Sequence, residues 1–370
     1  MPRTGLRVQA CGDAHLLNFG CFATPERNVI FDINDFDETL PAPWEWDLKR
    51  LAASVVLAGR HIGLRDSDSE RAALASARSY VKRMAEYSAM RALDVWYDKI
   101  DVDELLQLTP DAAARKRLEQ QLRKERTRTV ADHDFPKLAE QHGSTPVIRD
   151  NPPLIFHPDA EETSALRSQF HISFARYRET LNPGIRQLLD RFHFCDLAVK
   201  VVGVGSVGTR CTISLFIAGK DDPLFLQAKE ARASVLERYA GKSEYPNHGE
   251  RVVVGQRMMQ AASDVFLGWT RSRRGYDFYV RQLHDLRVSV VIEGWDFEAL
   301  RAYARTCAWA LARAHARTGD AAMISGYMGS GGIFPEAICE FAVGYADQTA
   351  RDHKAFAKAI RDGRIEAQIE

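Results

Sequence analysis

A block of short strands interrupts an otherwise helical chain, and this change of texture most restricts the possible fold. Between residues 197 and 228, three runs of β-branched and aromatic residues are separated by glycine-containing turns, the pattern of an antiparallel meander, and two more strands are expected after it. The expected strands are 197–204, 209–218, 224–228, 265–270 and 276–283. On both sides, apolar residues recur three and four positions apart, which predicts amphipathic helices. We therefore expect an α+β fold in which a small β unit is inserted into a helical one.

The helical segments suggest how the chain is divided. They are expected at residues 46–62, 67–96, 110–128, 161–192, 249–262, 297–317 and 335–360. The segment 142–158 is rich in proline and glycine and predicts a connector. A chain of 370 residues is too long for one small core. The expected regions are a helical large lobe (1–150), a connecting helix with a β lobe (151–285) and closing helices (286–370).

Charge and cysteine content exclude several classes of protein. The chain has 50 Lys and Arg residues against 50 Asp and Glu, whereas a general binder of nucleic acids or anionic membranes needs a basic excess. The six cysteines include no C-x-x-C pair, which predicts reduced thiols rather than disulfides or a zinc site. The sequence also lacks a secretory signal and any run of eighteen apolar residues. A cytoplasmic protein without a membrane span is expected.

Two polar motifs near the N-terminus carry the first candidate chemistry. The first, residues 12–20, contains Asp13, His15 and Asn18. The second follows an apolar strand and places four carboxylates within seven residues: Asp32, Asp35, Asp37 and Glu38. Carboxylates this close repel one another unless cations or hydrogen-bond donors compensate them, and Mg²⁺ prefers such oxygen ligands. The pattern predicts a base with metal ligands; the alternative is a polar turn whose side chains cap the backbone.

A glycine-rich segment in the middle of the chain is the second candidate for a functional site. It spans residues 203–208 and contains Gly203, Gly205, Ser206 and Gly208. A dinucleotide-binding loop requires a helix after the third glycine, but here a strand is expected, as in the flap that covers nucleotide phosphates in kinases. An ordinary glycine-rich hairpin is the alternative.

One lysine stands where such a lobe would keep its phosphate-binding lysine. Lys229 ends an apolar strand about twenty residues beyond the glycine segment, the position of that lysine in kinases. Its carboxylate partner is expected on a following helix. Glu250 and Glu237 are the candidates, and Glu250 is favoured because it opens the longer helix.

Four segments together resemble a known bacterial family, that of the domain of unknown function 2252. They are Cys-Gly-Asp-Ala-His-Leu-Leu-Asn-Phe-Gly (11–20), Phe-Asp-Ile-Asn-Asp-Phe-Asp-Glu-Thr (31–39), Trp-Glu-Trp-Asp-Leu-Lys-Arg-Leu-Ala (44–52) and Ala-Arg-Ala-His-Ala-Arg-Thr-Gly-Asp (312–320). The resemblance covers essentially the whole chain. It implies no settled activity.

A more distant resemblance, to a family of enzymes, does imply an activity. The segment Gly12-Asp13-x-His15-x-x-Asn18 is similar to the catalytic loop of aminoglycoside and choline phosphotransferases, which share the protein-kinase-like fold. Asp35-Phe36-Asp37 is similar to their metal-binding segment. The resemblance implies Asp13 as the base, Asn18 and Asp35 as metal ligands with Asp32 as the rival to Asp35, and Asp47 as a buttress of the loop. Because the glycine segment follows this loop instead of preceding it, the resemblance implies a circularly permuted kinase-like fold.

These observations lead to an expected function. We expect a phosphotransferase that uses ATP and Mg²⁺ and acts on a small-molecule hydroxyl acceptor, with no nucleic-acid or membrane partner. The alternatives are a catalytically inactive nucleotide-binding regulator and a metal-dependent phosphoesterase, which would require further histidine ligands. The expectation depends on one juxtaposition: Asp35 and Lys229 must face each other.

Overall fold

The structure is a computed structural model, and it consists of two compact units. It describes residues 4–108, 115–116, 119–120, 135–143, 145–201, 208–219, 222–283, 287–288 and 290–366. The first unit combines Met1–Phe19, Ala42–Asp98 and Val290–Glu370, and the second combines Gly20–Pro41 with Lys99–Ser289. The fold is α+β, with helices and several small antiparallel sheets.

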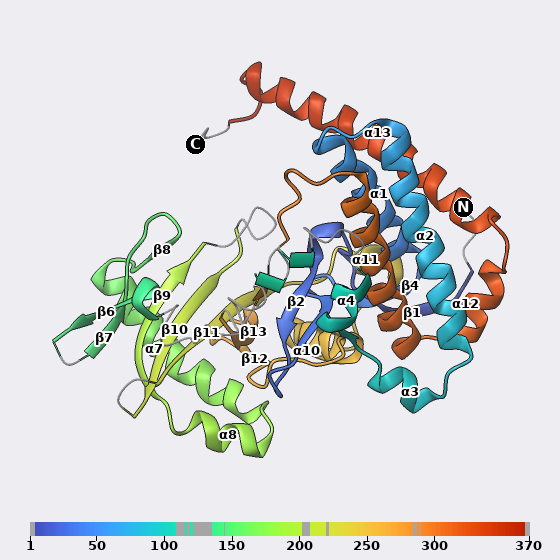
Figure 1. Ribbon diagram of the computed structural model, residues 1–370. Coiled ribbons are helices and arrows are strands. Elements are labelled where there is room, and N and C mark those ends of the chain that lie inside the picture. The colour runs from blue at the N-terminus through green and yellow to red at the C-terminus, as the bar shows by residue number, and fades with distance from the viewer. Residues whose placement is uncertain are drawn as a thin grey trace. The chain divides into compact units, whose positions relative to one another are not determined.

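The first unit is mainly helical. Its elements are β1 (Arg7–Ala10), the 3-10 turn η1 (Leu16–Asn18), α1 (Glu45–His61), α2 (Asp66–Ser88), α3 (Ala92–Tyr97), α11 (Phe297–Thr318), α12 (Ala321–Met328) and α13 (Ile333–Arg361). Helix α2 packs along α1 and α11, and α13 packs against α1 and α2 (Figure 1). Segments from the beginning and the end of the chain therefore form one helical core.

The sequence of α1 shows why this core forms. Its apolar residues Leu48, Leu51, Ala52 and Val55 recur at helical spacing and are all fully buried. Asp47 stands in the first turn, where a negative charge is favourable. Just before the helix, the Trp44 ring stacks on Tyr80 of α2 with ring centroids 5.7 Å apart.

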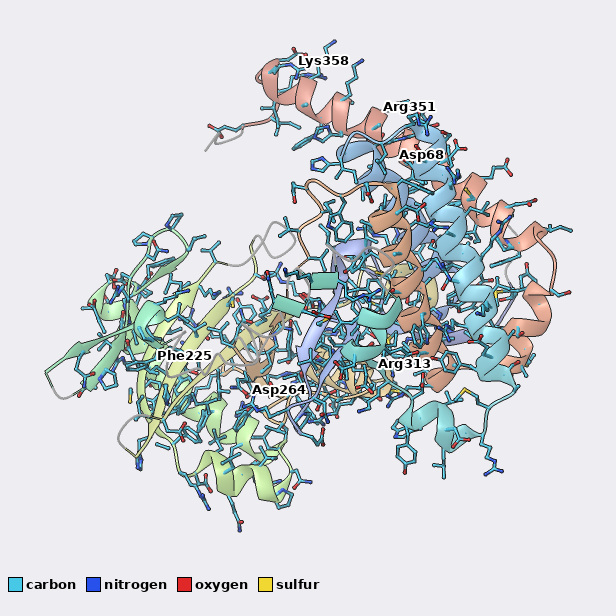
Figure 2. The ribbon with its side chains drawn as sticks, viewed as in Figure 1. Asp68, Phe225, Asp264, Arg313, Arg351 and Lys358 are labelled. Atoms are coloured by element: carbon cyan, nitrogen blue, oxygen red, sulfur yellow. The ribbon has the colours of Figure 1, made fainter. Side chains whose placement is uncertain are left out.

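The second unit is built on a six-stranded antiparallel sheet. Its order is β12 (Gly268–Arg271), β13 (Asp277–Gln282), β11 (Asp222–Ala231), β10 (Cys211–Ala218), β9 (His193–Lys200) and β8 (Ile155–Phe156). Alternate side chains pack on opposite faces, as strand geometry requires. Phe225, which is labelled in Figure 2, belongs to one hydrophobic cluster together with Leu215, whereas Phe216 and Leu226 belong to another. Both faces of the sheet are covered.

Smaller elements complete the second unit. A four-stranded sheet has the order β14 (Arg287–Val288), β2 (Phe19–Ala23), β3 (Val29–Ile33) and β5 (Ile100–Asp101). The other elements are α4 (Val102–Leu108), α6 (Phe135–Leu138), β6 (Ala139–His142), β7 (Thr145–Ile148), α7 (Ala160–Glu179), α8 (Pro183–Leu189), α9 (Glu237–Ala240) and α10 (His248–Met259). Strand β4 (Leu40–Pro43) is where the chain passes from the second unit into the first.

The expected three-stranded meander is confirmed as β9, β10 and β11, but several expected helices and one loop differ. The helix expected at 67–96 breaks between α2 and α3, and the one expected at 161–192 breaks before Pro183, which begins α8. The connector expected at 142–158 instead contains β7 and β8, which pair with neighbouring strands through their backbones. Helix α12 was not expected. Most of the helix expected at 110–128 lies outside the described residues.

Over the described residues, no helix combines the length and the apolar character needed to cross a bilayer.

Candidate functional site

The first candidate site residues lie on a loop, residues 11–18, which we call the Asp13 loop. Its second residue, Gly12, has φ +87°, a left-handed conformation that favours glycine. The backbone N–H of Cys11 donates to Oδ2 of Asp47 at 2.6 Å, and the N–H of Gly12 donates to Oδ1 of Asp47 at 2.9 Å. Asp47 therefore supports the loop through both carboxylate oxygens, as the resemblance implied.

One face of α1 holds the rest of the Asp13 loop. Asp47, Arg50 and Ser54 are spaced three and four apart, so they lie on the same side of the helix. Arg50 Nε donates to Oδ1 of Asp13 at 2.9 Å. Ser54 Oγ accepts the N–H of Leu16 at 2.8 Å. The loop follows α1 over two turns and is bonded at three points.

The loop exposes Asp13 and buries Asn18. The side chain of Asp13 is 51% exposed, and Nε2 of His15 lies 3.7 Å from its Oδ2. Asn18 is buried, and its Nδ2 donates to the carbonyl of Asp13 at 3.0 Å and toward Cys11 Sγ at 3.5 Å. The Asp13 carboxylate is therefore accessible to solvent, while Asn18 stabilises the backbone that carries it.

A buried polar chain stands behind Asp47. Nε2 of His315 on α11 lies 3.2 Å from Oδ2 of Asp47, and Nδ1 of His315 lies 2.8 Å from the hydroxyl of Tyr80 on α2. All three side chains are almost completely buried. Burial, followed by the negative charges of Asp47 and Glu45, raises the pKa of Tyr80 well above its ordinary value of 10.0.

In the second unit, the acidic segment after β3 meets Lys229 of β11. Lys229 Nζ lies 2.8 Å from Oδ2 of Asp37 and 3.4 Å from Oδ2 of Asp35. The lysine side chain is only 10% exposed, whereas Asp35 and Asp37 are 43% and 39% exposed. Two residues nearly two hundred positions apart in the sequence are therefore brought together, as expected.

The carboxylates of Asp35 and Asp37 share one positive charge, the ammonium of Lys229. Desolvation raises the pKa of Asp37 above its ordinary value of 3.8; the negative charge of Asp35 adds to this effect and Lys229 opposes it. Oδ1 of Asp37 and the hydroxyl of Tyr279 are both buried. The two groups lie close enough to shift each other's pKa. Oxygen ligands with excess negative charge are what a hard divalent cation requires.

Asp32 has a different environment. It is fully buried, and its two oxygens accept the N–H of Ile33 and the N–H of Ala261, both at 2.9 Å. A carboxylate engaged in this way fixes the backbone around it. Asp35 and Asp37 are more accessible to a metal ion, and among the described residues no three His, Cys, Asp or Glu side chains already converge on one point.

The structure does not bring Glu250 to Lys229. Within the described part of the chain, the ion pairs of Lys229 are those with Asp35 and Asp37. Glu250 stands in the first turn of α10, where its N–H is capped by Oδ1 of Asn247 at 3.2 Å. Glu237 lies 4.0 Å from Nδ1 of His248. The expected partner of the lysine is thus replaced by the acidic segment itself.

Part of the glycine segment is described. Gly208 has φ +78°, and its carbonyl accepts a hydrogen bond from Arg232 Nη2 at 2.5 Å. Gly203, Gly205 and Ser206 lie outside the described residues. Their expected role as phosphate-binding residues stays a prediction.

The family model DUF2252, described as an uncharacterized protein conserved in bacteria, matches residues 1–359. The chain belongs to the DUF2252 family. No curated protein and no solved structure gives a significant match.

Membership of the DUF2252 family confirms the first resemblance and assigns no activity. The segments that carried the resemblance now have places in the structure. Residues 11–20 include the Asp13 loop, 44–52 enter α1, and 312–320 end α11 with His315. In this DUF2252 protein, three of the four segments therefore meet at Asp47.

Sequence reasoning missed Arg251 of α10. Its Nη1 donates to the carbonyl of Thr39 at 2.6 Å, and its Nη2 donates to the carbonyls of Asp37 and Arg232, both at 2.8 Å. The side chain is fully buried, so it fixes the acidic segment beside β11. No local signal in the sequence marks this residue, because the burial of Arg251 and its contacts with backbone carbonyls are set by tertiary packing.

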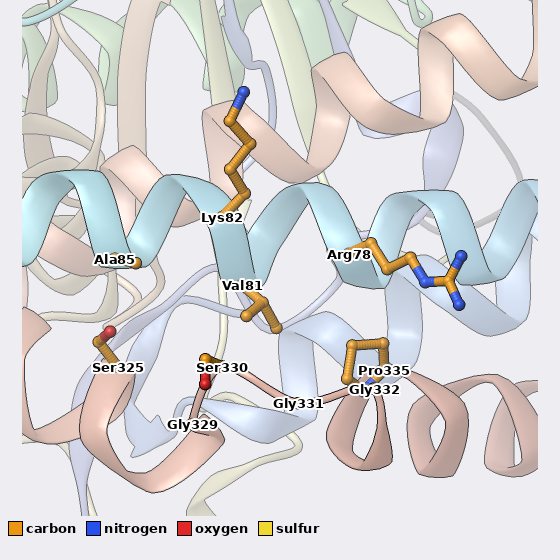
Figure 3. Close-up of a pocket in the computed structure, with 10 residues that line it drawn as sticks. All are labelled: Arg78, Val81, Lys82, Ala85, Ser325, Gly329, Ser330, Gly331, Gly332 and Pro335. Atoms are coloured by element: carbon orange, nitrogen blue, oxygen red, sulfur yellow. The ribbon is translucent and has the colours of Figure 1, made fainter.

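A separate cavity lies in the first unit of this DUF2252 protein. It has a volume of about 610 Å³ and lies between α2 and the segment that joins α12 to α13 (Figure 3). Val81 points toward the segment Gly329–Gly332, whereas Lys82 points away from it. None of the predicted site residues lines this cavity.

Proposed function

We propose that this protein is a phosphotransferase that uses ATP and Mg²⁺ and acts on the hydroxyl group of a small molecule. The observation that carries the proposal is the contact of Lys229 with Asp35 and Asp37, at 3.4 and 2.8 Å. A lysine at the edge of a carboxylate pair matches what a nucleotide triphosphate bound with a metal ion requires: a cation for the phosphates and oxygen ligands for the metal.

Lys229 would bind the phosphates. Its ammonium is largely buried and is held against Asp35 and Asp37, so it is ordered before any ligand arrives. A compact ammonium interacts with phosphate as a point charge. The glycine segment, which leads into β10 next to β11, would add backbone N–H donors from Gly203 to Gly208.

Asp35 would be the main metal ligand, with Asp37 as a further candidate. The fit rests on the donor set: two carboxylates, 43% and 39% exposed, that share one lysine. Mg²⁺ would neutralise the charge of the triphosphate. Asp32 is assigned to the backbone, because both of its oxygens accept N–H groups.

Asp13 would orient the acceptor hydroxyl and take its proton. Its carboxylate is half exposed, while its backbone is fixed by Asp47 and Asn18. His15 lies beside the carboxylate and would contact the acceptor. Positioning and charge compensation would supply most of the rate enhancement. The circularly permuted kinase-like fold is part of the same proposal.

Turnover tests the proposal. Wild type, Lys229→Ala and Asp35→Ala would be incubated with ATP, Mg²⁺ and pooled small hydroxyl compounds, and ³¹P NMR would follow conversion of ATP to ADP and a phosphomonoester. Asp222→Ala is the matched control, because Asp222 is an exposed carboxylate at the beginning of the same strand. We expect turnover in wild type and the control only. ATP-induced thermal stabilisation without turnover would indicate the inactive regulator, and neither signal in wild type would contradict the proposal.

A further inference from the structure

The support of the Asp13 loop does not end at Asp47. His315 approaches Oδ2 of Asp47 at 3.2 Å, and Tyr80 approaches the other ring nitrogen of His315 at 2.8 Å. These residues come from α1, α11 and α2, and each is at most 1% exposed. Three helices therefore meet through one chain of polar groups that ends at the backbone of the loop.

The direction of the hydrogen bonds follows from the acceptor at one end of the chain. The carboxylate of Asp47 can only accept, so Nε2 of His315, which lies 3.2 Å from Oδ2 of Asp47, is assigned the ring proton. In that tautomer Nδ1 of His315 is the acceptor, and the hydroxyl of Tyr80 donates to it at 2.8 Å. That N–H donates to Asp47 Oδ2, which also accepts the N–H of Cys11.

The chain of donors gives the Asp47 carboxylate a single orientation. A buried carboxylate needs hydrogen bonds for its charge, and the loss of one donor leaves the charge incompletely solvated. Without His315, the side chain of Asp47 would no longer be fixed in the orientation in which one oxygen accepts the N–H of Cys11 and the other accepts the N–H of Gly12. The loop that carries Asp13 would then lose its fixed geometry.

We propose that His315 and Tyr80 are positioning residues of the Asp13 loop, which they hold in place through the Asp47 carboxylate. The catalytic meaning of this role rests on the proposed function, but the ordering of the loop does not. A misplacement of about 1 Å can cost a reaction a hundredfold in rate. The effect is therefore expected in the rate of turnover and not in the affinity for ATP.

The test compares four variants of the full chain. Tyr80→Phe removes the hydroxyl but keeps the ring that stacks on Trp44. His315→Gln keeps an N–H donor near the Nε2 position, whereas His315→Leu removes it. Tyr177→Phe is the matched control, because Tyr177 is an equally buried tyrosine of the second unit whose hydroxyl donates to the carbonyl of Phe266 at 2.6 Å.

Two readouts decide the question: amide hydrogen exchange at Cys11 and Gly12, and kcat against KM for ATP. We expect exchange at these two amides to accelerate about tenfold or more in Tyr80→Phe and His315→Leu. It should stay near the wild-type rate in His315→Gln and Tyr177→Phe. Where wild type turns over ATP, kcat should fall in the first two variants with KM unchanged.

Three results would overturn the inference. The first is wild-type exchange at both amides in Tyr80→Phe and His315→Leu. The second is equal effects of His315→Gln and His315→Leu, since the N–H would then be irrelevant. The third is unchanged kcat despite faster exchange. If wild type has no turnover, the proposed function fails, and the exchange rates alone still decide whether His315 and Tyr80 hold the loop.

Discussion

Lys229 Nζ lies 2.8 Å from Oδ2 of Asp37, although 192 positions of sequence separate the two residues. The contact joins the third strand of the meander to the segment that follows β3. It places a nearly buried ammonium beside two half-exposed carboxylates. The buried guanidinium of Arg251 donates to the backbone carbonyls of Asp37 and Thr39 and to that of Arg232, and so ties the acidic segment to the end of β11. The fold itself thus brings Lys229 and the acidic segment together.

The raised pKa of Asp37 predicts a pH dependence of stability. Because the folded-state pKa lies above the ordinary 3.8, the folded protein retains this proton at pH values where the unfolded chain has lost it. The contribution of Asp37 to the free energy of unfolding is therefore greatest below pH 3.8 and is lost as the pH rises through the folded-state pKa. The Tm of wild type minus that of Asp37→Asn should fall over this range.

Asp190 is the control of opposite sign. The hydrogen bond from Arg178 lowers the pKa of Asp190 below 3.8, so its contribution is present above pH 3.8 and is lost as the pH falls. For Asp190→Asn the corresponding difference in Tm should decrease toward low pH. The account of Asp37 would be wrong if both variants followed the same trend between pH 3 and pH 8.

Arg251→Met should destabilise the second unit. The change leaves the carbonyls of Thr39, Asp37 and Arg232 without their shared donor, which predicts a loss of about 3 kcal/mol in the free energy of unfolding. Arg257 of the same helix is exposed and donates to one carbonyl, that of Leu267. Denaturant unfolding of Arg257→Met should show a loss of about 1 kcal/mol or less. Equal losses of unfolding free energy in the two variants would argue against a special role of Arg251 in fixing the acidic segment.

Gly249→Ala should also destabilise the protein. A Cβ atom at this position would lie 2.2 Å from the carbonyl oxygen of Phe278, so α10 or β13 would have to move. Overpacking of this kind costs about 1–3 kcal/mol. In contrast, a Cβ on Gly344 of α13 meets nothing within 4 Å, and Gly344→Ala should stabilise by about 0.5–1 kcal/mol. Chemical denaturation of both variants checks the predicted difference in sign.

Asp13→Asn should separate chemistry from binding. The amide keeps the size of the side chain but cannot accept a proton from the acceptor, so kcat should fall about 10²- to 10⁴-fold. Thermal stabilisation by ATP and Mg²⁺ should remain as in wild type. An Asp13→Asn enzyme with full turnover, measured by ADP formation, would remove Asp13 from the reaction.

Local patterns in the sequence predicted much of the second unit. The alternation of apolar residues located β9, β10, β11, β12 and β13, because period-two patterns depend on near neighbours. Helix ends were less accurate. The breaks before Ala92 and Pro183 depend on turns that helical periodicity does not reveal. Of the strands within 142–158, β7 pairs with the preceding β6 and β8 pairs with β9, and their proline-rich sequence resembles a connector.

The candidate site was predicted unevenly for the same reason. Asp13, Asp35 and Lys229 stood out because motif spacing is visible in one sequence. The partner of Lys229 was expected on a helix, yet the acidic segment provides it, since long-range contacts are set by tertiary packing. Arg251, His315 and Tyr80 act through backbone groups and buried side chains, which no local pattern displays.

Calorimetric titration with ATP and Mg²⁺ tests the central proposal most directly. Wild type and Lys242→Met, which changes an exposed lysine of the same unit, should bind with equal affinity. Lys229→Met should bind at least about tenfold more weakly, because a buried charge-assisted contact to the phosphates is lost. If wild type shows no binding, or if Lys229→Met binds as tightly as wild type, the proposed nucleotide site is wrong.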